Sequence, residues 1–328
     1  MMSVGRINLY DNMKAIAIIL VVIGHINEFS LGGYNSILYH FYDSFHMSIF
    51  FFVSGLFLFK KFDADESIFA IAKKIFVQCY NRSLQLLLPF VIVGMLYCYS
   101  SQESIFSIFD GNELRFWFLP SLCIDIFIVY AAYFIFRCLN VKHIAIKCIM
   151  AIGVWLCCYA LTIVFNGLKD CHYYMMAIRN LPFLGFGILY NSVSKMKKWI
   201  SDERVLASCF MSYVLFFIWC SNWFQMKWGG YLVIPMMIYI CSRYESSIPK
   251  WFTKIGRSTL AIYVFHYFLL PNIPLAEYMK QNLSQNIVIY ILASLLLTVP
   301  IIVLCMCLEK IIDSNRYLKL LIWFKKTK

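Results

Sequence analysis

The chain of 328 residues is 62% apolar and 14% charged, whereas soluble domains are roughly 45–50% apolar and 25% charged. This composition excludes a soluble globular protein and predicts one polytopic membrane domain over residues 1–328. The formal net charge of +12 indicates membrane orientation rather than a nucleic-acid partner, because most basic residues lie between or beside apolar segments.

Ten apolar segments follow one another along the chain. They lie near residues 13–31, 45–59, 83–99, 116–136, 148–166, 173–190, 205–220, 228–241, 258–271 and 287–308. Unpaired backbone groups are costly in hydrocarbon and the runs are continuous rather than alternating, so we predict an all-α bundle of about ten transmembrane helices. With a cytoplasmic N-terminus, 24 of the 29 basic residues fall on the cytoplasmic side, and the positive-inside rule then predicts that both termini are cytoplasmic.

The first apolar segment carries four ionisable residues, Asp11, Lys14, His25 and Glu28. Lys14 and His25 are eleven positions apart, about 20° from a whole number of helical turns, with a rise of roughly 16 Å. They therefore point the same way at different depths. Asp11 precedes Lys14 by three residues and Glu28 follows His25 by three, so each basic group has a carboxylate within one turn.

Two interpretations of this face are open. In the first, Lys14 reaches the cytoplasmic headgroups beside Asp11 while His25 donates to a backbone carbonyl, which is a structural role. Alternatively, the face lines a polar cavity in which Lys14 neutralises an anionic ligand and His25 is a general base, because its ordinary pKa near 6.5 suits proton transfer.

The segment from Arg6 to His25, RINLYDNMKAIAIILVVIGH, resembles the opening helix of the acyltransferase 3 family of integral-membrane O-acetyltransferases. Residues 45–59, FHMSIFFFVSGLFLF, are similar to that family's second helix. In NRSLQLLLPF, Arg82 matches a basic residue before the third helix, although Gln85 stands where a second Arg is common. The segments WFLPSL, RNLPFLGFGIL and GRSTLAIYVFH resemble later blocks in the same order.

The resemblance implies transfer of an acetyl group from cytoplasmic acetyl-CoA to a hydroxyl of a surface polysaccharide or lipid-linked glycan, in the bacterial cytoplasmic membrane. His25 would be the base, and Glu28 either orients its imidazole or is an interfacial residue. The acetyl-CoA phosphates call for cations at the cytoplasmic mouth. The candidates are Lys14 held by Asp11, together with Lys73, Lys74, Arg82 and Arg257.

The candidates for acceptor binding are Arg179, Trp117, His46, His266 and Ser54. Arg179 suggests an anionic partner or a water-facing site, and Trp117 could stack on a sugar, although Trp also forms interfacial belts. His46 and His266 could line the pore or be structural. Ser54 could donate to an oxyanion or could pack closely beside Gly55.

The sequence has no glycine-rich phosphate loop and no metal-ligand spacing, so it predicts no bound metal. A proton-coupled transporter or flippase of a glycan or small solute is the main alternative, with the charged face as a proton relay. Such transporters often have repeated halves, which we do not find. A structural or sensory membrane protein is a third alternative, disfavoured by the cost of burying Lys14, His25 and Arg179. No oligomeric state is predicted.

Overall fold

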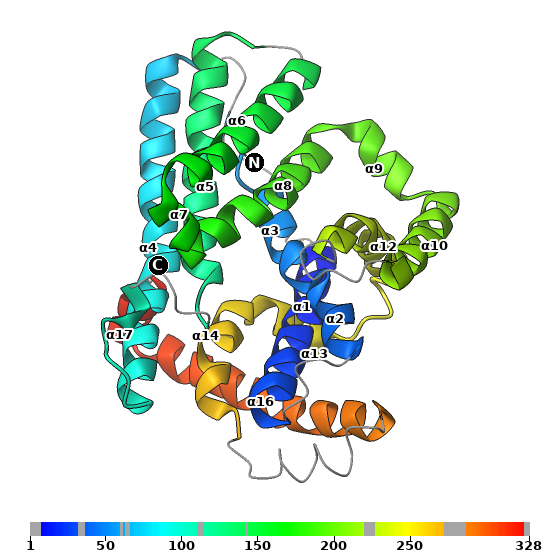
Figure 1. Ribbon diagram of the computed structural model, residues 1–328. Helices are drawn as coiled ribbons and strands as arrows, with labels where there is room; N and C mark the ends of the chain where they lie inside the picture. Colours follow the sequence, from blue (N-terminus) through cyan, green and yellow to red (C-terminus); the bar gives the residue numbers. More distant parts are fainter. Residues whose placement is uncertain are drawn as a thin grey trace. The chain divides into compact units, whose positions relative to one another are not determined.

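Helices make up the regular secondary structure of the computed structural model (Figure 1), over the residues that it describes: 8–31, 37–59, 62, 66–109, 115–141, 144–219, 227–271 and 287–324. Each of the ten predicted segments falls on a helix. These are α1 (Asn8–His25), α3 (His46–Leu56), α4 (Ile68–Ser100), α5 (Phe118–Cys138), α6 (Ile144–Val164), α8 (His172–Ser192), α10 (Glu203–Trp219), α12 (Gly230–Arg243), α14 (Thr259–Leu269) and α16 (Ile287–Ser314).

The all-α fold class is confirmed for the described part of the chain. Five of its helical segments are long and apolar enough to cross a membrane: Asn8–Ser30, Ile68–Ser100, Phe118–Cys138, Ile146–Val164 and Ile291–Ser314. Two shorter apolar helices are Gly230–Arg243 and Thr259–Leu269. Ten crossings and two cytoplasmic termini therefore stay predictions.

The chain divides into two compact units. Unit 1 contains residues 1–53 and 189–311, and unit 2 contains residues 54–188 and 312–328. Helices α3, α8 and α16 each continue from one unit into the other. The prediction of a single membrane domain stays a prediction.

Unit 1 is built around α1. Side chains on several sides of this helix, among them Met13, Ile18 and Val22, are fully buried, which is typical of a helix at the centre of a bundle. The other elements of unit 1 are the π-helical turn η1 (Ile26–Ser30), α2 (Ile37–Asp43), α9 (Ser194–Ile200), α10, η3 (Lys227–Gly229), α12, α13 (Lys250–Arg257), α14 and most of α16.

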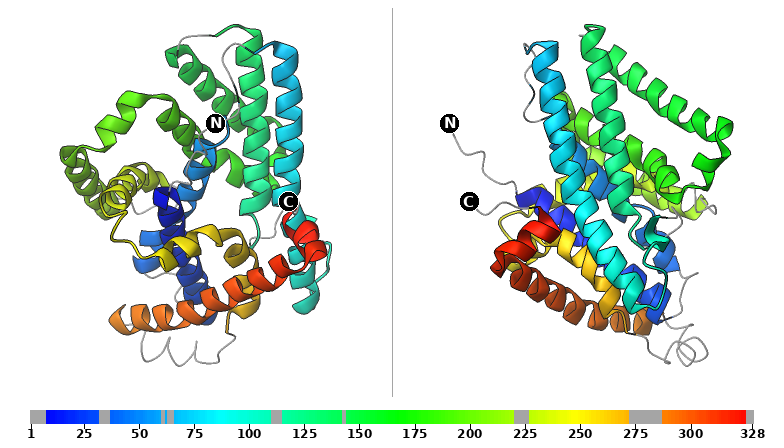
Figure 2. Two further views of the ribbon diagram at one scale, coloured as in Figure 1. Left: turned by 180° about the vertical axis from the view of Figure 1, so that it is seen from behind. Right: turned by 90° about the vertical axis from the view of Figure 1, so that its left-hand side faces the viewer.

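Unit 2 contains α4, η2 (Ser107–Phe109), α5, α6, α7 (Asn166–Asp170), most of α8 and α17 (Arg316–Trp323). Figure 2 shows α4 and α5 side by side in both views. Two buried tyrosines fasten the helices: the Tyr130 hydroxyl donates to Gln78 Oε1 at 2.7 Å, and the Tyr173 hydroxyl donates to the Ile108 carbonyl at 2.7 Å. Helix α6 leaves Ile149 and Ile163 about two-thirds or more exposed (68% and 74%), as expected for a surface that faces lipid.

Candidate active site

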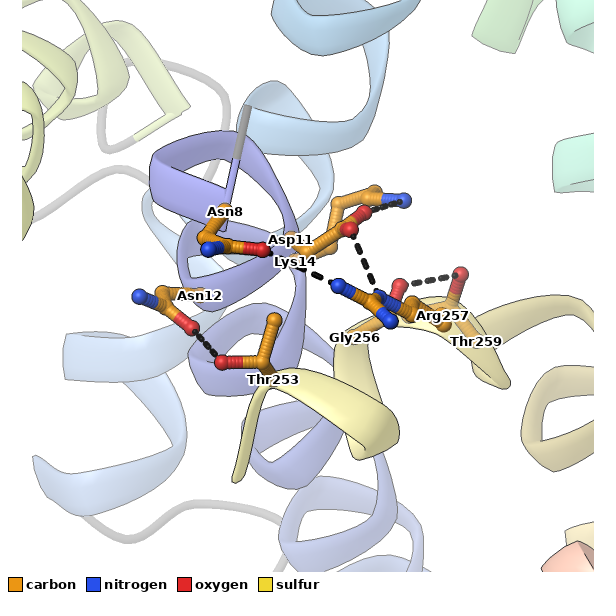
Figure 3. Close-up of polar contacts among 8 residues, drawn as sticks. All are labelled: Asn8, Asp11, Asn12, Lys14, Thr253, Gly256, Arg257 and Thr259. Atoms are coloured by element: carbon orange, nitrogen blue, oxygen red, sulfur yellow. Dashed lines mark hydrogen bonds and ion pairs between the residues drawn. The ribbon is translucent and has the colours of Figure 1, made fainter. Parts of the chain in front are cut away.

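A cluster of charged groups surrounds the first turn of α1 in unit 1 (Figure 3). We call Asn8, Asp11, Lys14 and Arg257 the Asp11 cluster. Lys14 Nζ lies 2.8 Å from Asp11 Oδ1, and Arg257 Nε donates to Asp11 Oδ2 at 3.2 Å. The second guanidinium arm donates to Asn8 Oδ1 at 2.9 Å. Two cations thus share one carboxylate, which leaves one net positive charge.

Helix α13 brings Arg257 to this position because small residues on its inner face allow a close approach to α1. Thr253 and Gly256, one turn apart, are buried, and Thr253 Oγ1 donates to Asn12 Oδ1 at 2.8 Å. A Cβ atom added at Gly256 would lie 1.7 Å from the Asp11 carbonyl oxygen. Only glycine fits at this helix contact.

The accessibility of the Asp11 cluster differs from one member to another. The side chain of Asp11 is only 6% exposed, whereas those of Lys14 and Arg257 are 21% and 42% exposed. The buried Asp11 carboxylate therefore holds the two cations in place, and Lys14 and Arg257 expose their hydrogen-bond donors at the surface. Such an arrangement can bind a phosphate group by charge-assisted hydrogen bonds.

A second cluster lies at the other end of α1. We call His25, Glu28, His266 and Tyr267 the His25 cluster. His25 Nε2 lies 2.9 Å from the Tyr267 hydroxyl, and His25 Nδ1 lies 3.4 Å from Glu28 Oε2. The imidazole thus has a carboxylate on one side and a hydroxyl on the other, and its side chain is 23% exposed.

The backbone changes its winding directly after His25. Residues Ile26–Ser30 form a π-helical turn, closed by a hydrogen bond from the Leu31 amide to the Ile26 carbonyl at 3.0 Å. Such turns are rare and occur frequently at functional sites. Within this turn Asn27 is buried, accepts from the Ser294 hydroxyl at 2.5 Å and donates to the Tyr42 hydroxyl at 3.1 Å. The turn that carries Glu28 is therefore fixed on both sides by polar contacts.

We assign the proton of a neutral His25 to Nδ1, because the Glu28 carboxylate lies 3.4 Å from this nitrogen, although Nδ1 makes no hydrogen bond within the described residues. With this tautomer the Nε2 lone pair accepts from the Tyr267 hydroxyl. An acid, an imidazole and a hydroxyl in this order have the roles of a general-base triad. The arrangement can remove a proton from a hydroxyl and stabilise the resulting imidazolium.

The other two predicted histidines of unit 1 each contact the backbone carbonyl four residues earlier, which lies on α2 for His46 and on its own helix α14 for His266. His46 Nδ1 lies 2.6 Å from the Tyr42 carbonyl oxygen, and His266 Nδ1 lies 2.9 Å from that of Ile262. His266 is fully buried and its ring centroid lies 5.2 Å from that of His25. His266 therefore belongs to the His25 cluster. Nothing in these contacts brings His46 to it, and the predicted pore-lining role of His46 stays a prediction.

The predicted phosphate-binding residues Lys73, Lys74 and Arg82 lie on α4 in unit 2. Lys74 forms an ion pair with Glu66, whose backbone carbonyl accepts from Arg137 at 2.9 Å. Lys74 is therefore engaged in fastening the start of α4. Lys73 and Arg82 are exposed on the same helix, and their predicted role stays a prediction.

The remaining predicted residues, Trp117, Arg179 and Ser54, also lie in unit 2. The ring of Trp117 lies edge-on to that of His172, with centroids 6.3 Å apart. Arg179 lies on α8, and its guanidinium nitrogens Nε and Nη2 are buried. Beside Ser54, a Cβ atom added at Gly55 would lie 2.1 Å from the Leu184 carbonyl oxygen, so α3 packs against α8 through this small-residue segment. The acceptor-binding roles stay predictions.

Sequence reasoning missed Tyr267 and assigned Arg257 no particular partner. Their contacts with His25 and Asp11 span 242 and 246 positions. Periodicity within one helix cannot predict contacts between helices so far apart in the sequence. The only sequence signal was the block GRSTLAIYVFH, which contains Arg257 and ends one residue before Tyr267.

The described residues thus define a helical membrane protein in which His25, Glu28, His266 and Tyr267 form a polar cluster. Comparison with protein families agrees with that class: a family model described as an acyltransferase domain matches residues 7–310. The chain belongs to this acyltransferase 3 family, and the match supports a multi-pass membrane acyltransferase. Comparisons with curated proteins and with solved structures found no match.

Proposed function

We propose that this acyltransferase transfers an acetyl group from cytoplasmic acetyl-CoA to a hydroxyl of a surface polysaccharide or lipid-linked glycan, in a bacterial cytoplasmic membrane. The observation that carries the proposal is the hydroxyl of Tyr267 at 2.9 Å from His25 Nε2, with the Glu28 carboxylate beside Nδ1. A ring nitrogen at hydrogen-bond distance from a hydroxyl has the geometry that a general base needs to activate one.

The reaction is an acyl transfer from a thioester to an alcohol. The acceptor oxygen forms a bond to the thioester carbonyl carbon as its proton passes to the His25 base. The imidazolium is stabilised by Glu28. Collapse of the tetrahedral intermediate breaks the carbon–sulfur bond, and the proton returns to the sulfur of CoA.

In this proposal the Asp11 cluster binds the phosphates of the acetyl donor, acetyl-CoA. CoA carries several phosphate charges, and Lys14 and Arg257 together keep one positive charge beyond that of Asp11. Lys14 lies about three turns of helix before His25, since eleven positions correspond to roughly 16 Å of helix rise. This separation leaves room for an extended donor with its phosphates at one cluster and its thioester at the other.

The proposal can be tested by adding [14C]acetyl-CoA to membranes that contain the protein and the native glycans. The wild type should label the glycan and release CoA. The His25→Ala protein, present at the same level in the membrane, should transfer acetyl groups at least about 100-fold more slowly. Ile19→Ala on the same helix is the control and should keep the wild-type rate. Labelling by His25→Ala at the wild-type rate would refute the role of His25.

Release of CoA also separates this proposal from transport. Glycan movement into proteoliposomes without CoA release, and without labelled product, would instead support the transporter or flippase.

A further inference from the structure

Tyr267 occupies the reacting side of the proposed base. Its side chain comes from α14 and is 5% exposed, and its hydroxyl lies 2.9 Å from His25 Nε2. A neutral imidazole has one lone pair. An acceptor hydroxyl therefore cannot donate to Nε2 while Tyr267 does, so Tyr267 must either leave or take part.

The packing of the phenol ring holds it in place. Its centroid lies 4.8 Å from that of His25, 4.1 Å from that of His266 and 6.3 Å from that of Phe29. The neighbouring His266 is itself held by the Ile262 carbonyl at 2.9 Å. Moving the phenol away would break these contacts and open a buried gap. A phenol oxygen, by contrast, has the lone pairs to accept a hydrogen bond while its own O–H donates.

We propose that Tyr267 is a catalytic residue that relays the proton from the acceptor hydroxyl to His25. The inference rests on the proposed acetyl transfer and adds a second residue to it. As the acceptor oxygen bonds to the thioester carbon, its proton passes to Tyr267 Oη, and the phenolic proton passes to His25 Nε2. When the carbon–sulfur bond breaks, Tyr267 Oη gives the proton that it took from the acceptor to the sulfur of CoA, and His25 Nε2 returns its proton to Tyr267 Oη. Tyr267 is unchanged after each turnover.

Three titratable groups face the relay in the described part of unit 1. His25 and Glu28 come from α1 and η1, and His266 comes from α14. Glu28 stabilises the cation that the relay creates on His25. The ring of His266 packs against both His25 and Tyr267 and holds the phenol over the imidazole.

The first test compares two tyrosines of unit 1. Tyr267→Phe removes the relaying hydroxyl and keeps the ring, so we expect kcat for [14C]acetyl transfer in native membranes to fall about 100-fold or more, with the KM for acetyl-CoA unchanged. Tyr213→Phe is the matched control. Its buried hydroxyl binds Ser44 Oγ at 2.8 Å, away from the His25 cluster, and its loss should leave kcat unchanged.

The second test changes the acidity of the phenol and keeps its shape. Incorporation of 3,5-difluorotyrosine at position 267 should restore most of the activity lost in Tyr267→Phe and should move the alkaline limb of the kcat–pH profile to lower pH. A hydroxyl that only fills space would leave this profile unmoved. An unmoved profile, or Tyr267→Phe turning over at the wild-type rate, would overturn the relay.

The controls separate the two proposals. If the wild type transfers acetyl groups and His25→Ala does not, while Tyr267→Phe is fully active, the relay alone is wrong. If the wild type transfers no acetyl group from acetyl-CoA, the proposed function is wrong and the relay with it. Equal detergent-extracted amounts and equal melting temperatures of the two phenylalanine variants exclude misfolding as the cause of a rate loss.

Discussion

Asp11 and Glu28 differ in burial and in their partners, although each is a carboxylate three residues from a basic group on the same helical segment. Asp11 is buried and braces two cations, Lys14 and Arg257. Glu28 has a side chain that is 24% exposed and faces a single imidazole nitrogen. The first arrangement fixes the position of positive charge, and in the reaction that we propose the second stabilises the charge that forms on His25.

The outward-facing cation Arg257 should contribute to donor binding. We expect Arg257→Gln to raise the KM for acetyl-CoA about tenfold, since one charge-assisted hydrogen bond contributes roughly 1.5–3 kcal/mol, and to leave kcat unchanged. Lys254→Gln, one turn earlier and exposed on the same helix, is the control. Initial rates against acetyl-CoA concentration measure both, and an equal KM for the two variants would contradict the donor site.

The charge of Glu28 should matter more than its shape. Glu28→Gln keeps the side-chain volume and removes the anion beside His25 Nδ1, so we expect kcat to fall roughly 10- to 100-fold through loss of imidazolium stabilisation. The KM for acetyl-CoA should not change. Glu245→Gln, an exposed carboxylate of unit 1, controls for loss of a negative charge. A wild-type kcat in Glu28→Gln would indicate that Glu28 is only an interfacial residue.

At the scale of elements, the site depends on α13 lying against α1. Thr253 and Gly256 form the contact, and the backbone at Gly256 approaches that of Asp11 so closely that no side chain fits. Helix α13 thereby places Arg257, and α14, which begins two residues later, places Tyr267. One close helix contact thus positions both Arg257 and Tyr267.

Gly256→Ala tests this contact. A methyl group 1.7 Å from a backbone oxygen must push α13 away, so we expect a loss of about 1–3 kcal/mol of stability and a weaker binding of acetyl-CoA. Gly153→Ala is the control, because a Cβ atom there meets nothing within 4 Å; it should be neutral or stabilising by about 0.5–1 kcal/mol. Thermal unfolding of the purified proteins in detergent measures both, and equal melting temperatures would refute the close contact.

At the scale of the whole molecule, the positive-inside rule gives a testable orientation. A green fluorescent protein fused after Lys328 should fluoresce, because the C-terminus is predicted to be cytoplasmic. Alkaline phosphatase fused after Phe109, within the acidic connection near residues 100–115, should be active outside the cytoplasm. The reverse pattern of activities would contradict the orientation and with it the cytoplasmic position of the Asp11 cluster.

The sequence by itself determined the helical class, the ten apolar segments and the pairing of Asp11 with Lys14 and of Glu28 with His25. All of these follow from periodicity and from contacts within one helical turn. Both depend only on residues that are close together in the sequence. The motif resemblance also led to the acyltransferase 3 family, which the family match confirms.

Only the tertiary structure decided what completes each cluster. Arg257 reaches Asp11, and Tyr267 reaches His25, across more than 240 positions, and the engagement of Lys74 by Glu66 was likewise not visible in the spacing of α4. Such contacts depend on which helices pack together and at what distance, because small residues such as Gly256 permit an approach that their sequence position alone does not specify.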